Sequence, residues 1–274
     1  MDFLELLRVI FLSIVQGITE WLPVSSTGHM ILVDEFLTFN YSEEFRSVFF
    51  VVIQLASVMA VVTTFFKKLN PFEFKDGFKT DPKKVRLWFK IIVACVPAAV
   101  IGVFFDDFIE THLNGPMVIA TTLILYGVVF IVVENMNKDK TPQITNLGQI
   151  TYKLALFIGL FQVLAVIPGT SRSGATIIGG LILGMSRKNI AEFTFFLAIP
   201  VMFGASLLRI VRVGWDFTGA EWITMIVGCA VAFVVSVVTI KFLLGFIKRN
   251  NFKPFAYYRI ALGLIVLTYF LFLN

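Results

Sequence analysis

Two short polar turns in an otherwise apolar chain carry the side chains that could do chemistry. The first turn reads Gln16-Gly-Ile-Thr-Glu20-Trp-Leu-Pro-Val-Ser25-Ser26-Thr27-Gly28-His29. Gln16 and Glu20 are four residues apart, which places them on one face of a helix. The hydroxyl groups that follow open a second helix, whose free N–H groups and positive dipole end favour phosphate. We therefore predict an anion site here; the alternative is that the serines only cap a helix.

The second turn repeats this pattern with a guanidinium group in place of the carboxylate. It reads Pro168-Gly169-Thr170-Ser171-Arg172-Ser173-Gly-Ala-Thr176. A glycine lets the backbone approach a ligand closely, and Arg172 matches phosphate oxygens as a two-pronged donor that stays charged. The alternative is that Arg172 only pairs with Glu20.

Two such turns suit a ligand with two phosphate groups. A carboxylate beside phosphates indicates a divalent cation that is held by one or two acidic ligands together with phosphate oxygens. The sequence contains no Cys/His cluster for zinc and no GxxxxGK[ST] motif, which argues against ATP-driven work.

The composition indicates an all-α integral membrane protein. Of the 274 residues, 58% are hydrophobic and 15% are charged, whereas about a quarter are charged in an average soluble domain. A spanning helix needs about 20 mostly apolar residues. The predicted spans are Ser47–Phe66, Leu87–Phe105, Met117–Val133, Ile190–Ile210, Trp222–Ile240 and Ala256–Leu273. A carboxylate at membrane depth, such as Glu20, is a functional candidate by default.

Both polar turns interrupt apolar regions that are too broken to span. We predict that residues 1–39 and 150–185 form re-entrant helical hairpins, because irregular backbone inside a membrane must be packed in protein or line a cavity. Shifting the chain by 146 residues superimposes Gln16 on Gln162 and Ser25 on Ser171. The single membrane domain, 1–274, would then be an inverted repeat of 1–135 and 150–274, each a hairpin plus three spans.

The loop charges predict the orientation in the membrane. Loops 67–86, 134–153, 186–189 and 241–255 hold sixteen of the 23 Lys and Arg residues, so their face is expected to be cytoplasmic. Because the basic residues lie in these loops, the net charge of +5 is explained by membrane orientation and does not indicate a nucleic-acid partner. Both termini and the acidic cluster Asp106, Asp107 and Glu110 would lie outside, where we expect the active-site cleft to open.

At this point the motifs resemble a known family, the undecaprenyl-diphosphate phosphatases of bacteria of the bacitracin-resistance type. That family has (Glu/Gln)-x-x-x-Glu leading into Pro-x-Ser-Ser-Thr-Gly-His, and Pro-Gly-x-Ser-Arg-Ser-x-x-Thr. The ending Lys253-Pro-Phe-Ala-Tyr-Tyr-Arg259 is also similar. The resemblance implies Mg²⁺- or Ca²⁺-dependent hydrolysis of the lipid carrier's diphosphate in the bacterial inner membrane, which recycles the carrier for cell-wall synthesis. Bacitracin, which binds the substrate, would compete indirectly.

The resemblance also implies roles for particular residues. Glu20 would hold the metal, supported by Gln16, and Arg172 would stabilise charge on the transferred phosphoryl group. His29 could be general acid, general base or nucleophile; Ser26 is the competing nucleophile, with His29 as its base. Direct attack by water stays open. The predicted substrate-binding residues are Gln16, Ser25, Thr27, Gly169, Thr170, Ser171, Ser173 and Thr176.

A rival function belongs to another class of protein. Inverted repeats with broken helices are a transporter device, so a secondary transporter or a flippase of a phosphorylated lipid carrier would use much the same residues. The combination of a carboxylate that could bind a metal, an imidazole and several hydroxyl groups around one anion site favours an enzyme over a transporter. The sequence leaves the oligomeric state open, a homo-oligomer included.

Overall fold

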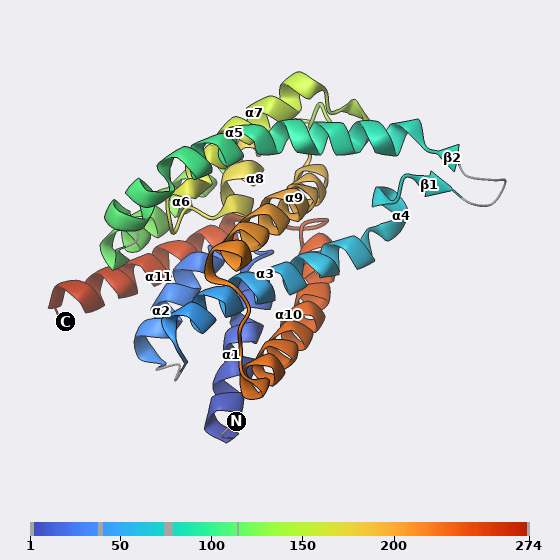
Figure 1. Cartoon of the computed structure of the whole chain (residues 1–274). Helices are drawn as coiled ribbons and strands as arrows, with labels where there is room; N and C mark the ends of the chain where they lie inside the picture. The colour runs from blue at the N-terminus through green and yellow to red at the C-terminus, as the bar shows by residue number, and fades with distance from the viewer. Residues whose placement is uncertain (1–2, 38–40, 74–78, 114, 273–274) are drawn as a thin grey trace.

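The computed structural model describes residues 3–37, 41–73, 79–113 and 115–272, and it is helical in almost every long element (Figure 1). Among these residues, six helices are long and apolar enough to cross a membrane. They are α3 (Glu43–Thr64), α5 (Pro82–His112), α6 (Pro116–Met136), α9 (Arg187–Val213), α10 (Gly219–Phe246) and α11 (Lys253–Phe272). Each corresponds to one predicted span, so the all-α membrane class is confirmed.

Shorter helices flank the two polar turns. The first turn joins α1 (Phe3–Thr19) to α2 (Ser26–Phe36). The second joins α7 (Tyr152–Val163) and the 3-10 turn η2 (Leu164–Val166) to α8 (Arg172–Ile182). The remaining short elements lie in loops: α4 (Phe66–Leu69), η1 (Leu147–Gln149) and the antiparallel strands β1 (Phe72–Glu73) and β2 (Lys79–Thr80).

Several polar side chains lie inside the bundle, while many large apolar side chains face outward. On α5, Val103 and Phe104 are 65% and 79% exposed, whereas Gln16 and Glu20 are 2% and 4% exposed. In lipid an exposed apolar side chain costs nothing, and the helices associate through close packing and interior polar contacts. The buried polar centre is therefore where function is expected.

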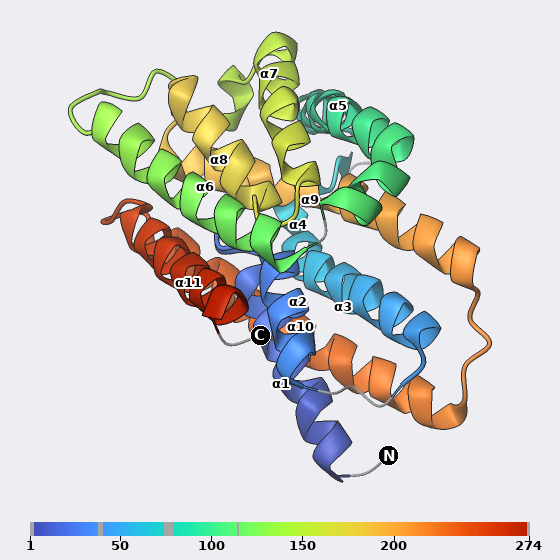
Figure 2. The ribbon, with the colours of Figure 1, turned by 90° about the vertical axis from the view of Figure 1, so that its left-hand side faces the viewer.

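Each hairpin packs against a span from the other half of the chain. Helix α1 lies along α10, and α7 lies along α5 (Figure 2). A Cβ atom on Gly17 of α1 would meet the carbonyl oxygen of Ala232 at 2.9 Å, and one on Gly159 of α7 would meet that of Ala94 at 2.3 Å. Glycine at these two positions permits the backbones to approach closely, which holds both turns in the middle of the bundle.

Contacts between loops gather the basic segments at one end of the bundle. Glu134, in the last turn of α6, pairs with Arg187 at the start of α9 and accepts a hydrogen bond from the Phe252 backbone N–H. Lys68 pairs with Glu192 at 2.6 Å. All four basic loops are thus linked to the same end, as the loop-charge argument requires; we call it the basic end.

Contacts also bring the two ends of the second hairpin together. The backbone N–H groups of Gln143 and Ile144, before α7, donate to the carbonyl oxygen of Gly184, after α8. Such contacts are expected of a hairpin that returns to the side it entered. Re-entry into a membrane and the inverted repeat stay predictions. The side chains of Asp106, Asp107 and Glu110 lie outside the described residues.

Candidate active site between two turns

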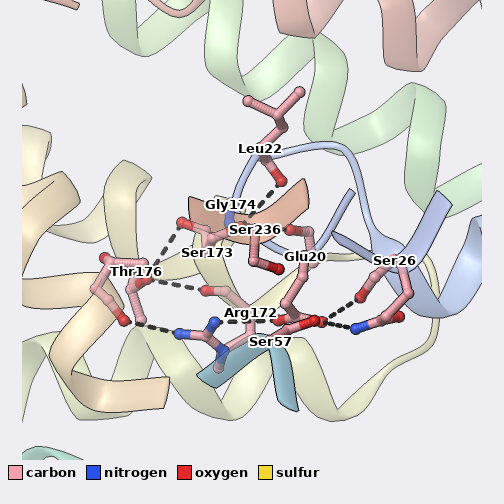
Figure 3. A network of polar contacts seen from close by, with 12 residues as sticks. Glu20, Leu22, Ser26, Ser57, Arg172, Ser173, Gly174, Thr176 and Ser236 are labelled. Atoms are coloured by element: carbon pink, nitrogen blue, oxygen red, sulfur yellow. Dashed lines mark hydrogen bonds and ion pairs between the residues drawn. The ribbon is translucent and has the colours of Figure 1, made fainter. Parts of the chain in front are cut away.

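The tips of the two hairpins meet in the centre of the bundle (Figure 3). Ser173 Oγ, on the second turn, donates to the Leu22 carbonyl oxygen of the first turn at 3.3 Å. Arg172 Nη2 reaches Glu20 Oε1 at 3.1 Å. Side chains that are 152 residues apart in the sequence therefore form one site.

Glu20 is the centre of this network. Its Oε2 accepts hydrogen bonds from Gln16 Nε2 at 3.0 Å and from Ser26 Oγ at 2.7 Å, while Oε1 faces Arg172. The side chain is 3% exposed, so the negative charge is stabilised by three donors rather than by bulk water. The predicted helical pairing of Gln16 with Glu20 is confirmed.

One of the three nitrogen atoms of the Arg172 guanidinium group has no partner among the described residues. Its Nη1 donates to the Thr194 carbonyl oxygen of α9 at 2.8 Å, and Nη2 donates to Glu20. Its buried Nε has no hydrogen-bond partner among the described residues. A buried donor without a partner costs free energy, and a phosphate oxygen would satisfy it.

In each hairpin, a serine with a strained backbone caps the N-terminus of the second helix. Ser25 and Ser171 both have φ of 74°, and they are the only non-glycine residues with positive φ among those described. Each accepts a hydrogen bond on Oγ from the backbone N–H three residues later, Gly28 and Gly174 respectively. Such a backbone costs about 1–3 kcal/mol and is typical of functional sites. The equivalence of the two serines supports the predicted repeat.

His29 lies apart from the Glu20 network. Its Nδ1 lies 2.7 Å from the Ser25 carbonyl oxygen, which can only accept, so Nδ1 carries the proton. Its Nε2 then accepts from the Tyr258 hydroxyl at 2.7 Å, and the two rings stack at 5.6 Å. Both ring nitrogens are engaged, and Ser26 donates to Glu20 instead. The geometry therefore favours Glu20 over His29 as the base for Ser26.

The remaining predicted binding residues are the three at the second tip, Gly169, Ser171 and Ser173, and the three threonines. Gly169 has φ of 85° and packs against α6, and Ser171 and Ser173 share a hydroxyl contact of 3.1 Å at the second tip. Thr27 is exposed, Thr170 is buried, and the Thr176 hydroxyl is bonded to Thr194 Oγ1 at 2.8 Å. The Thr176 hydroxyl also donates to the Arg172 carbonyl oxygen at 2.9 Å, so Thr176 belongs to the outer part of the network in Figure 3 but does not contact Glu20.

Sequence reasoning gave no role to Arg259, which ties the two turns together. Its Nη1 donates to the Pro23 carbonyl oxygen at 3.1 Å, and its Nη2 donates to that of Gly169 at 2.8 Å. The side chain is fully buried. The sequence could have indicated a role for Arg259, because it lies in an apolar run and a charged side chain at membrane depth is a functional candidate. Tyr258, the partner of His29, is its neighbour on α11.

A divalent cation fits this site only together with a phosphate ligand. Among the described residues, no group of three or more His, Cys, Asp and Glu side chains could hold a metal ion by itself. Glu20, the Ser26 hydroxyl and the Gln16 amide offer oxygen donors of the kind that Mg²⁺ and Ca²⁺ prefer, and Mg²⁺ commonly uses one or two carboxylates plus substrate phosphates. The donor set therefore fits a cation that is bound with the diphosphate.

The fold defines a multi-pass membrane protein, and its buried polar centre is the candidate active site. The chain belongs to the family described as bacitracin resistance protein BacA, whose model matches residues 9–265. It is 59% identical to an undecaprenyl-diphosphatase of Enterococcus faecalis over 97% of this chain and 98% of the relative. It is 60% identical to one of Lachnoclostridium phytofermentans over 99% of both chains. The resemblance inferred from the two motifs is confirmed.

Proposed function

We propose that this protein is an undecaprenyl-diphosphate phosphatase. It hydrolyses the lipid diphosphate to the monophosphate and inorganic phosphate, returns the carrier to cell-wall synthesis and thereby confers resistance to bacitracin. The observation that carries the proposal is the contact between Glu20 and Arg172 across two turns, each of which begins a helix with a strained serine. The names of close, full-length relatives support it.

The chemistry that we assign to the site is phosphoryl transfer from the terminal phosphate. Arg172 and the N-terminal N–H groups of α2 and α8 bind the diphosphate oxygens and stabilise the charge that grows as the anhydride bond breaks. The 2.7 Å bond from Ser26 to Glu20 supports Glu20 as the acceptor of a proton, from the Ser26 hydroxyl or from an attacking water. His29, fixed by Ser25 and Tyr258, orients the first turn.

The cation that we assign is Mg²⁺ or Ca²⁺, held by Glu20 with Gln16 and Ser26 beside it. When bound, it would supply positive charge to the phosphate oxygens.

The orientation that we assign follows the distribution of charge. The basic end faces the cytoplasm of a bacterial inner membrane. Both termini and the mouth of the cleft are outside, so phosphate is released on the extracytoplasmic side.

The decisive experiment measures phosphate release from a prenyl diphosphate by the purified protein, with and without EDTA. We expect turnover that EDTA abolishes and added Mg²⁺ or Ca²⁺ restores. A protein that binds the lipid diphosphate without releasing phosphate under any of these conditions would be a carrier, and the proposal would be wrong.

A substitution at Arg172 separates binding from turnover. Arg172→Lys keeps the charge and loses the planar fork, so we expect some substrate binding to remain while kcat falls by about tenfold or more. Steady-state kinetics on the purified variant measure both. Loss of binding with kcat unchanged at saturation would mean that Arg172 acts only on the ground state.

Cysteine labelling in intact cells tests the orientation. Cys95 and Cys229 are first replaced by Ala, and single cysteines are placed at Ser42 or Lys79, both of which are exposed. A membrane-impermeant maleimide should label the cysteine at position 42 and not that at 79. Both should react after solubilisation, which controls for access. The reverse pattern would invert the protein, and labelling at both positions in intact cells would indicate dual insertion.

A further inference from the structure

A cavity of about 400 Å³ opens at the basic end, where the ends of four helices meet. The C-terminal ends of α6 and α10 and the first residues of α9 and α11 line it. It is separate from the candidate active site. Arg187, in the cavity, precedes Thr194, the partner of Arg172, by seven residues, which is about 10 Å along α9 at ~1.5 Å per residue.

The lining of this cavity carries a large excess of positive charge. Its cationic residues are Lys138, Arg187, Lys248, Arg249 and Lys253. Its single acidic lining residue, Glu134, is 1% exposed and accepts hydrogen bonds from Arg187 and from the Phe252 backbone N–H. Glu134 is therefore neutralised by Arg187, and no ion pair joins the other four cations to a carboxylate among the described residues.

The positive charge of the cavity comes from its side chains and not from the helix ends. Helices α9 and α11 begin at the cavity while α6 and α10 end there, so the partial positive and negative charges of these ends oppose one another. The amides of Asn250 and Asn251 offer further donors. Unpaired cations around a hollow repel one another, and an anion with several oxygen atoms would relieve that repulsion.

We propose that this cavity is a second anion site, which binds a phosphate group at the basic end of the bundle. Two sources carry that chemistry: the headgroup of an anionic membrane lipid and free inorganic phosphate. Basic pockets between spanning helices are typical lipid-headgroup sites. Tyr257, which is one turn along α11 from Lys253 and 57% exposed, is of the type that anchors a helix at the membrane surface.

Two matched variants test the site. The cavity variant carries Lys248→Gln, Arg249→Gln and Lys253→Gln. The control carries Lys67→Gln, Lys83→Gln and Arg86→Gln, which removes the same types of charge from the basic end but outside the cavity. Native mass spectrometry then measures how much protein retains phosphatidylglycerol or phosphatidylcholine. Binding of inorganic phosphate is measured by titration calorimetry, with the active site intact in every protein.

The outcomes separate the two sources. If the site takes a lipid headgroup, retention of phosphatidylglycerol falls about tenfold or more in the cavity variant and stays near wild type in the control. If it takes free phosphate, the calorimetric signal falls in the cavity variant alone. Equal losses in both variants, or no binding difference for either ligand, would overturn the proposal. Should the cavity variant misfold, the pair Lys248→Gln and Arg249→Gln, both exposed side chains, replaces it under the same criteria.

Discussion

Glu20→Gln should lower phosphate release by at least about a hundredfold, and a modest rise in Mg²⁺ should not restore it. The amide keeps the size of the side chain but removes the negative charge. Arg172 then loses its buried ionic partner, Ser26 loses its proton acceptor, and the cation loses its one carboxylate. Initial rates of phosphate release over a range of Mg²⁺ concentrations measure this.

Glu5→Gln is the matched control for this substitution. Glu5 is a buried acid on α1, the helix that precedes Glu20; it is 7% exposed and paired with Arg8 at 3.0 Å. It lies four turns from Glu20 and contacts neither turn, so we expect that variant to stay within about threefold of wild type. If Glu20→Gln also released phosphate at a rate within about threefold of wild type, the assignment of Glu20 as base and metal ligand would be wrong.

Arg259→Lys is also expected to have a large effect on turnover, although the side chain is proposed only to position the turns. A lysine can donate to one carbonyl oxygen or the other, but it lacks the fork that spans Pro23 and Gly169. The two tips then lose their mutual register, and a misplacement of about 1 Å at a reacting centre can cost about a hundredfold. We expect kcat to fall at least about tenfold while most of the protein stays folded.

The measurement that separates positioning from mere stability compares kcat with Tm. Arg209→Lys is the control, because Arg209 is a partly buried arginine that donates to Ser47 on α3, away from the turns. If Arg259→Lys lowers Tm but the folded protein keeps wild-type kcat, Arg259 supports only the fold.

Much of the fold could be predicted from the sequence because the membrane imposes a simple length rule. The apolar runs located the spans, and the Ser/Gly/Pro turns located the breaks between the shorter helices. The spacing of Gln16 and Glu20 predicted their contact, since helical geometry is local. From the sequence, the pairing of Arg172 with Glu20 was only the alternative to phosphate binding; the structure shows the pair, and the phosphate role of Arg172 stays a prediction.

The features that were missed depend on distant parts of the chain. Arg259 contacts a turn 236 residues earlier in the sequence, and no local pattern specifies which carbonyl groups a buried guanidinium will meet. The positive φ of Ser25 and Ser171 could not be predicted, because positive φ is typical of glycine and a serine in the sequence does not indicate it. The hydrogen bond between His29 and Tyr258 is another long-range contact that the sequence did not predict. Because His29 is engaged there, the Ser26 hydroxyl donates to Glu20 instead.

The packing of α1 against α10 has a consequence for how the protein is made. Gly17 enters the membrane early in synthesis, but its partner Ala232 follows only after some 200 further residues, roughly 10–40 s later at the usual rate of translation. Within that interval Glu20 must wait for Arg172, which follows it by 152 residues. A nascent chain that stalls before α10 would present the unmatched Gly17 face of α1 to the bilayer, a feature by which membrane quality control could distinguish it from the finished protein.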